Sequence, residues 1–369
     1  MTAPASRGRR TWRLAGRLLL GAVLALLLAV GIAAAVSSDV RFVLRGAYEE
    51  ARLLLRRRPL TELAADSTAP AAWREAAVLV FEARAFADTA IGLRVGDTYT
   101  TFAEVGRDTL VLVLSASPKN ALRAHLWRFP IVGSVPYRGF FSLDAAQAAQ
   151  RRFEAEGYDT YVRASPAFST LGWFNDPLLS TVLEGDRVDV AQTVFHESAH
   201  TTLYVPNATP FDESFAAFVG LRSAEAFFTA RGDTAAAGRA AAWWRDEVRL
   251  SRFYADLADT LTKVYGAGLA GPALDQARAA VFGAARAALE GGLGGELELY
   301  SGAELARRPL NNATVVAGRI YRTRLELFET LFQQAGGVRA AIQRLKAALD
   351  QEADAEPYDA LARLVGASP

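Results

Sequence analysis

The chain has 369 residues, of which 51% are hydrophobic and 22% are charged, so it is long and apolar enough to fold around a large core. It contains no cysteine, which excludes disulfides, cysteine nucleophiles and cysteine-ligated zinc or iron–sulfur sites. Five arginines precede the first long apolar run, and the rest of the chain carries a small negative charge, which argues against a nucleic-acid partner.

Residues 18–36 contain no charged side chain, and these 19 residues would form a helix of about 28 Å, close to the thickness of a bilayer's hydrocarbon core. The arginines before this segment predict a cytoplasmic amino terminus and an extracytoplasmic remainder. The competing interpretation is a signal peptide cleaved near Ala33, Ala34 and Ala35, which would release the protein into the periplasm. Because the segment is longer than the apolar stretch of most signals, the sequence favours a single-pass bacterial inner-membrane anchor with a periplasmic domain.

The remaining residues, 37–369, are expected to form one domain with three regions. Residues 37–90 predict amphipathic helices, the first ending at Arg56-Arg57-Arg58-Pro59. We interpret this arginine run as a solvated helix end rather than a contact with anionic lipid. Residues 91–180 predict a small sheet, with a helix at 145–156 and strands at 98–102, 109–114 and 160–163.

Residues 181–369 are rich in alanine and apolar at helical spacing. The expected helices run over 187–205, 211–231, 235–265, 272–290, 313–334, 336–350 and 357–365. The glycine-rich run at 291–295 lacks the following Gly-Lys-Ser/Thr of a phosphate-binding loop, so a plain loop is expected there. The predicted fold class is therefore α+β and mainly α, with a small β-sheet and a helical C-terminal half.

Residues 194–200 read Val-Phe-His-Glu-Ser-Ala-His, which places His196 and His200 four residues apart with Glu197 between them. On a helix this spacing puts both imidazoles on one face, one turn apart, where they can share a metal ion. The alternative, two unrelated surface histidines, is weaker because the pattern is rare in a chain with only three histidines. The third, His125, stands alone and indicates a packed or surface residue.

A catalytic zinc ion takes three protein ligands and keeps one position open for water. Since no histidine follows His200, a carboxylate is expected as the third ligand. We favour Glu213, because Thr209-Pro210-Phe211-Asp212 resembles the capped start of a second helix that can pack against the first. Asp212 and Glu225 compete for the same role.

These residue types predict the hydrolysis of peptide bonds with one Zn²⁺ ion. Zinc lowers the pKa of its bound water and polarises a carbonyl group. Glu197 adjoins a ligand without being one, so it is the candidate general base that passes the water's proton to the leaving amine. The developing oxyanion needs a further hydrogen-bond donor, for which the sequence offers Tyr137, Tyr204 and Tyr321.

The chain also resembles the predicted bacterial aminopeptidases, a gluzincin-like group of zinc metallopeptidases. The resemblance rests on A-Y-E-E-A-R-L-L-L-R-R-R-P-L (47–60), F-P-I-V-G-S-V-P-Y-R-G-F-F (129–141), Y-V-R-A-S-P-A-F-S-T-L-G-W-F-N-D-P-L-L-S-T (161–181), V-F-H-E-S-A-H-T-T-L-Y-V (194–205), F-D-E-S-F-A (211–216) and L-N-N-A (310–313). It implies a zincin-like fold in which His196, His200 and Glu213 bind zinc and Glu197 is the catalytic base. The chain departs from the family where Arg128 and Ser134 stand at expected cysteines and Asp212 at an expected asparagine.

The sequence therefore predicts a membrane-anchored zinc peptidase that acts on peptide substrates, with aminopeptidase activity favoured. A membrane-anchored zinc endopeptidase of envelope quality control has the same chemistry. A non-catalytic envelope scaffold with structural zinc would not need Glu197, and an amidohydrolase acting on cell-wall peptides is the last alternative.

Overall fold

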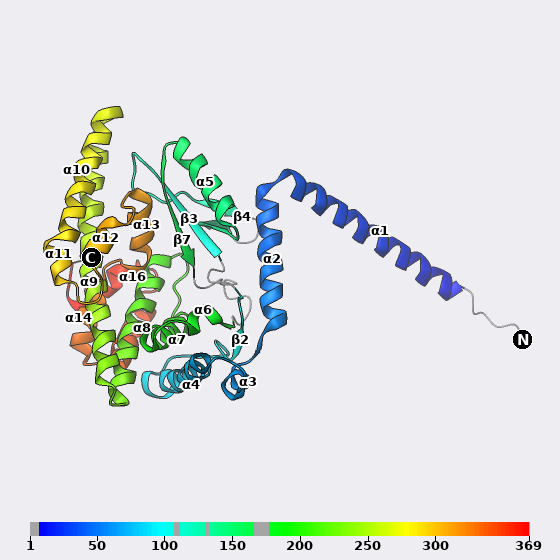
Figure 1. Ribbon diagram of the computed structural model, residues 1–369, viewed down its shortest axis with the longest axis horizontal. Helices are drawn as coiled ribbons and strands as arrows, with labels where there is room; N and C mark the ends of the chain where they lie inside the picture. The colour runs from blue at the N-terminus through cyan, green and yellow to red at the C-terminus, as the bar shows by residue number, and fades with distance from the viewer. Residues whose placement is uncertain (1–6, 107–110, 130–132, 166–176, 369) are drawn as a thin grey trace, which may run out of the picture. The chain divides into compact units, whose positions relative to one another are not determined.

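The computed structural model describes residues 7–106, 111–129, 133–165 and 177–368. The chain divides into two compact units, Met1–Arg52 and Leu53–Pro369. Its described part is mainly helical with small sheets, so the α+β, mainly α prediction is confirmed at that level (Figure 1).

The first unit contains one apolar helix, α1 (Arg7–Val36), whose segment Gly16–Val36 has a mean hydropathy of 2.8 and can serve as a signal sequence or a single anchor. Helix α2 (Ser38–Arg56) follows after Ser37 and ends at the arginine run, as the sequence predicts. The guanidinium of Arg41 donates hydrogen bonds to the carbonyl oxygens of Ala34 at 2.8 Å and Ala35 at 3.2 Å. It thereby satisfies carbonyl groups that the end of α1 leaves unpaired.

In the larger unit, α3 (Leu60–Ala65) and α4 (Ala71–Phe86) confirm the predicted helical region, and one π-helical turn, Ala87–Ile91, extends α4. The strand β1 (Arg58–Pro59) is not predicted by the sequence. It pairs with β2 (Thr101–Ala103), which pairs on its other side with β8 (Leu178–Leu179). A short helix, α6 (Ser180–Leu183), follows β8.

The second three-stranded sheet has the order β6 (Arg138–Phe140), β3 (Val111–Pro118), β7 (Tyr158–Ser165), and all its pairings are antiparallel. Helix α5 (Leu143–Ala155) covers one face, where Leu114, Ala116 and Trp127 are buried with Phe153 against them (Figure 1). A hairpin of β4 (Trp127–Phe129) and β5 (Gly133–Val135) forms a separate pair.

The expectation of one small sheet is therefore wrong, because the described residues form two three-stranded sheets and a two-stranded hairpin. Strand β2 joins β1 and β8 instead of β3. Each of those partners is only two residues long, so no alternation of polar and apolar side chains could reveal it.

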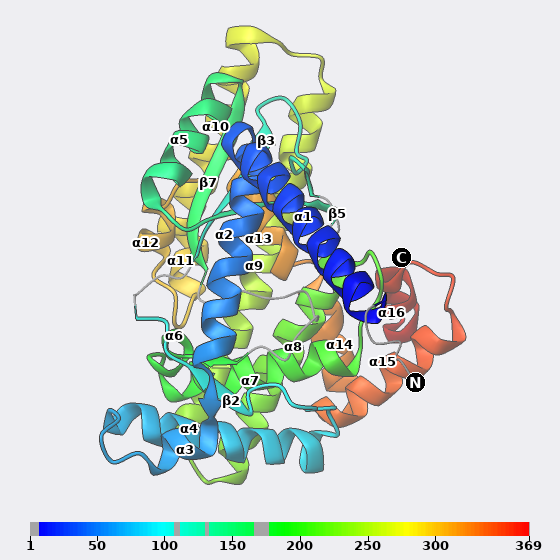
Figure 2. The ribbon, with the colours of Figure 1, turned by 90° about the vertical axis from the view of Figure 1, so that its right-hand side faces the viewer.

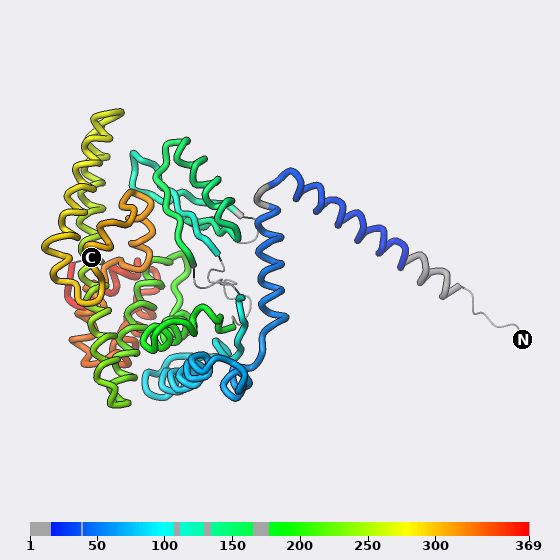
Figure 3. Tube along the Cα trace, in the orientation of Figure 1, coloured from blue at the N-terminus to red at the C-terminus, as the bar shows by residue number. Residues whose placement is uncertain are grey.

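The helical C-terminal half begins with α7 (Arg187–Thr202) and α8 (Thr209–Ala230), which lie side by side. Figure 2 shows α4 beside α7, and Figure 3 traces the long α9 (Thr234–Gly266) past α8. The remaining helices are α10 (Gly271–Glu290), α11 (Gly292–Glu296), α12 (Gly302–Arg307), α13 (Asn312–Tyr321), α14 (Leu325–Ala335), α15 (Val338–Gln351) and α16 (Pro357–Val365).

Two expectations in this half are corrected. The glycine-rich run is not a plain loop, because it forms the one-turn helix α11. The helix expected over 313–334 is broken into α13 and α14, since Arg324 has a left-handed φ of 51°. Around this break the Thr323 amide donates to the Ser214 hydroxyl, and the Ser251 hydroxyl donates to the Arg322 carbonyl oxygen. Both contacts are remote in sequence, so local periodicity could not report them.

The main core is formed by buried apolar residues of α3, α4, α7, α8, α9, α14, α15 and α16, and aliphatic and aromatic side chains both contribute to it. Its largest fully buried side chains are Trp244, Phe102, Phe195, Phe211, Phe215, Phe218, Phe228 and Phe328. Burying each large apolar side chain contributes about 1.5–3 kcal/mol. Five of these eight aromatic side chains belong to α7 and α8, so the two helices that carry the histidines and Glu213 are anchored in the core.

Candidate metal centre

The helix that carries the paired histidines starts with a capping box. The Asp186 carboxylate accepts hydrogen bonds from the amides of Val188 and Asp189, and the Asp189 side chain accepts from the Asp186 amide. Such reciprocal caps satisfy amides that have no partner inside the helix. The helix ends at Thr202, three residues before the expected end. The last turn of α7 is linked to the segment after α4, because the Arg94 amide donates a hydrogen bond to the Thr202 hydroxyl at 2.9 Å.

Ala191, Phe195 and Ala199 recur every four residues on α7 and form an apolar stripe that is completely inaccessible to solvent. His196 and His200 occupy the neighbouring stripe, and their imidazole Nε2 atoms lie 3.2 Å apart. The i, i+4 spacing thus brings the two rings together on one face of the helix.

The second helix, α8, begins differently from the prediction. Ala208 and not Thr209 occupies the position before the helix, and no side chain caps it. Asp212 instead turns back, and its Oδ1 atom accepts a hydrogen bond from the Val205 amide at 2.9 Å. This bond closes the connection between α7 and α8 and commits one oxygen of Asp212 to the backbone.

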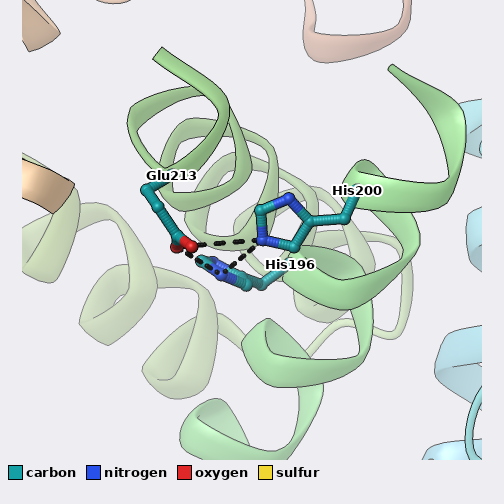
Figure 4. Close-up of side chains that lie close together, drawn as sticks. All are labelled: His196, His200 and Glu213. Carbon is teal, nitrogen blue, oxygen red and sulfur yellow. Dashed lines mark hydrogen bonds and ion pairs between the residues drawn. The ribbon is translucent and has the colours of Figure 1, made fainter. Parts of the chain in front are cut away.

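The two helices approach each other closely at Gly220 on α8. A Cβ atom at this position would lie 3.0 Å from the Gln192 carbonyl oxygen and 3.3 Å from the Cβ of His196. Two turns earlier on the same side of α8, the carboxylate of Glu213 reaches both histidines (Figure 4). The absence of a side chain at Gly220 thus permits the close helix approach at which the three side chains meet.

The three side chains could hold one metal ion, because one donor atom from each lies within 4.8 Å of the others. The Glu213 Oε2 atom is 3.5 Å from Nε2 of His196 and 3.8 Å from Nε2 of His200. Zinc with ligands at about 2.0–2.1 Å in a tetrahedron requires donor separations of about 3.3 Å. Both the donor set and its spacing fit zinc, with little movement required.

At His200 and Glu213, electrostatics favour the ionisation states that a metal ion requires. Burial and the neighbouring His196 lower the pKa of His200 to about 4, which keeps its imidazole neutral. Burial acts to raise the pKa of Glu213, but the hydrogen bond from His196 and the charges of His196, His200 and Arg163 together hold that pKa below its usual value. The same contact with Glu213, together with the charge of Glu197, raises the pKa of His196 against the effect of burial. A metal ion would take the place of the His196 proton.

The competing acids named from the sequence are engaged elsewhere. Asp212 bonds to the Val205 amide, and Glu225 pairs with Arg222 at 2.7 Å. Glu197 is half-buried on α7, and its charge acts on His196. Among the described residues, Glu213 is the carboxylate that the fold brings to the two histidines.

The surroundings separate the three candidate tyrosines. Tyr204 is 67% exposed and follows the end of α7. Burial and the charge of Glu213 raise the pKa of Tyr321 to about 12, and they raise that of Tyr137 as well. Tyr137 and Tyr321 are therefore the two tyrosines whose hydroxyl groups lie within electrostatic reach of the candidate metal centre.

One residue of this region is missed by the sequence reasoning. Arg163 on β7 forms a hydrogen bond with Tyr321, and its positive charge contributes to the lowered pKa of Glu213. Helix α13, which ends at Tyr321, packs against β7. Arg163 lies in the segment 161–181 that carries part of the family resemblance, and this was the one sequence signal that could have identified it. Residues 166–176 of that segment lie outside the described part of the chain.

Comparison with known proteins gives one family. A family model described as "Putative aminopeptidase" matches residues 41–361. No curated protein and no solved structure gives a significant match. Because the matched region covers most of the chain and includes α7, α8 and the candidate metal centre, the chain belongs to this aminopeptidase family.

Proposed function

We propose that this protein is a zinc-dependent aminopeptidase that uses His196, His200 and Glu213 as metal ligands and Glu197 as general base. The observation that carries the proposal is the donor triangle, with sides of 3.2, 3.5 and 3.8 Å, beside a half-buried glutamate. Membership of an aminopeptidase family supports peptides as substrates and the amino-terminal residue as the one released.

Zinc bound there would activate a water molecule and polarise the scissile carbonyl group. The protein's own groups carry the proton transfers. In this proposal the carboxylate of Glu197, the residue that follows His196 on α7, takes a proton from the attacking water and delivers it to the leaving amine. Glu213, with its lowered pKa, remains ionised and supplies negative charge to the site.

Tyr321 is the residue we assign to the developing oxyanion. A guanidinium group can only donate hydrogen bonds, so in their mutual bond Arg163 donates and the Tyr321 hydroxyl accepts. The tyrosine keeps its own proton for another acceptor. Its raised pKa keeps that proton in place at neutral pH. Tyr204, at 67% exposure, is not suited to this role.

We also propose that α1 is an inner-membrane anchor and that the Leu53–Pro369 unit faces the periplasm. The support is the apolar segment Gly16–Val36 and the five arginines that precede it. A reporter fused after Pro369 is expected to be active in the periplasm. Release of the protein into the soluble periplasm would instead indicate a cleaved signal.

The test compares the full chain with its Glu197→Gln and Glu213→Gln variants in detergent. The parent should hold about one zinc ion per chain and hydrolyse peptides with a free amino terminus. Glu197→Gln should keep the metal and lose about 10² to 10⁴-fold in turnover. Glu213→Gln should weaken zinc binding, because an amide replaces a charged ligand.

The outcomes also separate the alternatives. Equal cleavage of peptides with blocked and free amino termini would indicate an endopeptidase, and hydrolysis of cell-wall peptides alone would indicate the amidohydrolase. Zinc content without hydrolysis would favour a structural metal. A metal-loaded Glu197→Gln protein with undiminished turnover would rule out this general base.

A further inference from the structure

Helix α2 (Ser38–Arg56) carries an exposed apolar face that the proposed peptidase chemistry does not use. At 100° per residue, six exposed apolar residues fall within one arc of about 140°. They are Val43, Leu44, Ala47, Tyr48, Ala51 and Leu55. Tyr48 is 57% exposed and Leu55 is 86% exposed.

Arginines follow one edge of the arc. Arg41, Arg45, Arg52 and Arg56 recur at helical spacing beside Leu44 and Tyr48. Glu49 lies just beyond this row and pairs with Arg45 at 2.5 Å and with Arg52 at 3.8 Å. An apolar arc bordered by arginines is typical of a helix that lies in the interface of a membrane containing anionic lipid.

The last turn of α2, residues 53–56, belongs to the larger unit. Leu53 is 6% exposed and packs in a buried cluster with Ala103, Val105 and Val111. Leu55 comes two residues later and therefore points about 200° away from Leu53 around the helix axis. Within this last turn, the arc residue Leu55 and the core residue Leu53 therefore lie on opposite sides of the helix.

The chain itself indicates what covers the arc. The apolar segment Gly16–Val36 ends two residues before α2 begins at Ser38. A bilayer that holds this segment would bring its surface to the start of α2. The arginines beside the arc complement the negative charge of phosphate headgroups. The adjacent apolar segment of α1 favours a membrane over a soluble protein as the partner of α2.

We propose that α2 lies in the headgroup region of an anionic bilayer, with its arc at the acyl boundary and its arginines at the lipid phosphates. The catalytic unit would then be held at the membrane surface through the turn that carries Leu53. The proposal does not depend on peptidase activity. It revises our interpretation of the arginine run Arg56-Arg57-Arg58 as merely solvated, since Arg56 belongs to the row beside the arc.

The absence of cysteine allows a direct test with single-cysteine variants of the full chain. Ala47→Cys and Ala51→Cys place a small thiol on the arc, and Ser67→Cys places one at an exposed position in the turn after α3 as the matched control. Each variant is labelled with an environment-sensitive fluorophore and reconstituted into phosphatidylcholine vesicles, with or without phosphatidylglycerol. Quenching is measured with doxyl-labelled lipid and with aqueous iodide.

The fluorescence emission of the probes on Ala47→Cys and Ala51→Cys should shift to shorter wavelength. Doxyl lipid should quench these two probes several-fold more than the Ser67→Cys probe. Both effects should be larger in vesicles that contain phosphatidylglycerol. Iodide should quench only the control strongly. Iodide quenching of all three probes would overturn the proposal. Protection from both quenchers would also overturn it, because it would show that protein covers the arc. Peptide hydrolysis measured on the same preparations reports separately on the proposed function.

Discussion

Gly220 and His196 are in direct contact across the α7–α8 crossing, because a Cβ atom on the glycine would lie 3.3 Å from the Cβ of the histidine. The same Cβ would lie 3.0 Å from the Gln192 carbonyl oxygen, which is a backbone atom and cannot rotate away. Glu213 projects from the same helix as Gly220, so the distance between its carboxylate and the histidines depends on this contact.

We therefore expect Gly220→Ala to push the helices apart and to weaken zinc binding about 10- to 100-fold, the loss typical of disturbing residues that support a metal site. Gly238→Ala on α9 is the matched control, because its Cβ would meet no atom within 4 Å. Competition with a zinc chelator measures the affinities. Equal affinity in Gly220→Ala and the parent would show that the contact does not set the site's geometry.

Tyr321→Phe removes one hydroxyl group next to the candidate metal centre. If this group stabilises the oxyanion, kcat should fall about 10² to 10³-fold with KM and zinc content nearly unchanged. Tyr204→Phe makes the same chemical change at a residue that is 67% exposed and should leave kcat unaltered. Steady-state kinetics on metal-loaded proteins distinguish the two. A parental kcat in Tyr321→Phe would leave Tyr137 as the remaining candidate.

Arg128 and Ser134, which stand at expected family cysteines, are direct cross-strand partners in the β4–β5 hairpin. Opposed residues in antiparallel strands have Cα atoms about 4.5–5.5 Å apart, within the range that a disulfide requires. The double variant Arg128→Cys, Ser134→Cys should therefore form a disulfide and gain about 2 kcal/mol of stability from closing this short loop. Mass spectrometry after alkylation, with and without reductant, detects the bond.

The same variant tests topology in cells. A domain in the periplasm should be isolated with the bond formed, and a domain in the cytoplasm should be isolated reduced. Arg128→Cys alone controls for bonds between chains. Thiols that stay free even after purified protein is oxidised would contradict the hairpin register.

His125 provides a prediction about pH and stability. Its ring packs edge-on against Trp127, Phe153 and Tyr158, with centroids 4.6, 4.9 and 5.5 Å away. Burial lowers its pKa below the ordinary value of 6.5, so the unfolded chain binds the proton more readily than the folded one. Its contribution to stability is therefore complete above about pH 6.5 and is lost as the pH falls below that value.

His125→Phe keeps an aromatic ring but cannot be protonated. The unfolding free energy of the parent should fall relative to that of the variant between pH 7 and about pH 5. Denaturant unfolding at several pH values measures this difference, and comparison of the two proteins cancels the titration of His196 and His200. A difference that does not change with pH would contradict the prediction.

The pairing of His196 with His200 could be predicted from the sequence, because a helix places residues four apart on one face by local geometry alone. The burial of Ala191, Phe195 and Ala199 follows from the same period. The arginine end of α2 and most helix positions were also accessible, since caps and apolar spacing are local signals. What these residues do chemically remains a prediction.

The choice of the third donor needed the tertiary structure. Asp212, Glu213 and Glu225 lie on one helix, and sequence spacing cannot say which of them faces α7. The fold decides it through Gly220, which sets how closely the helices approach, and through the Val205 amide, which binds Asp212. Arg163 joins the site from a strand 50 residues before Glu213, and such a contact leaves no local pattern in the chain. Local helix geometry is encoded in neighbouring residues, whereas the completed site depends on how distant elements pack.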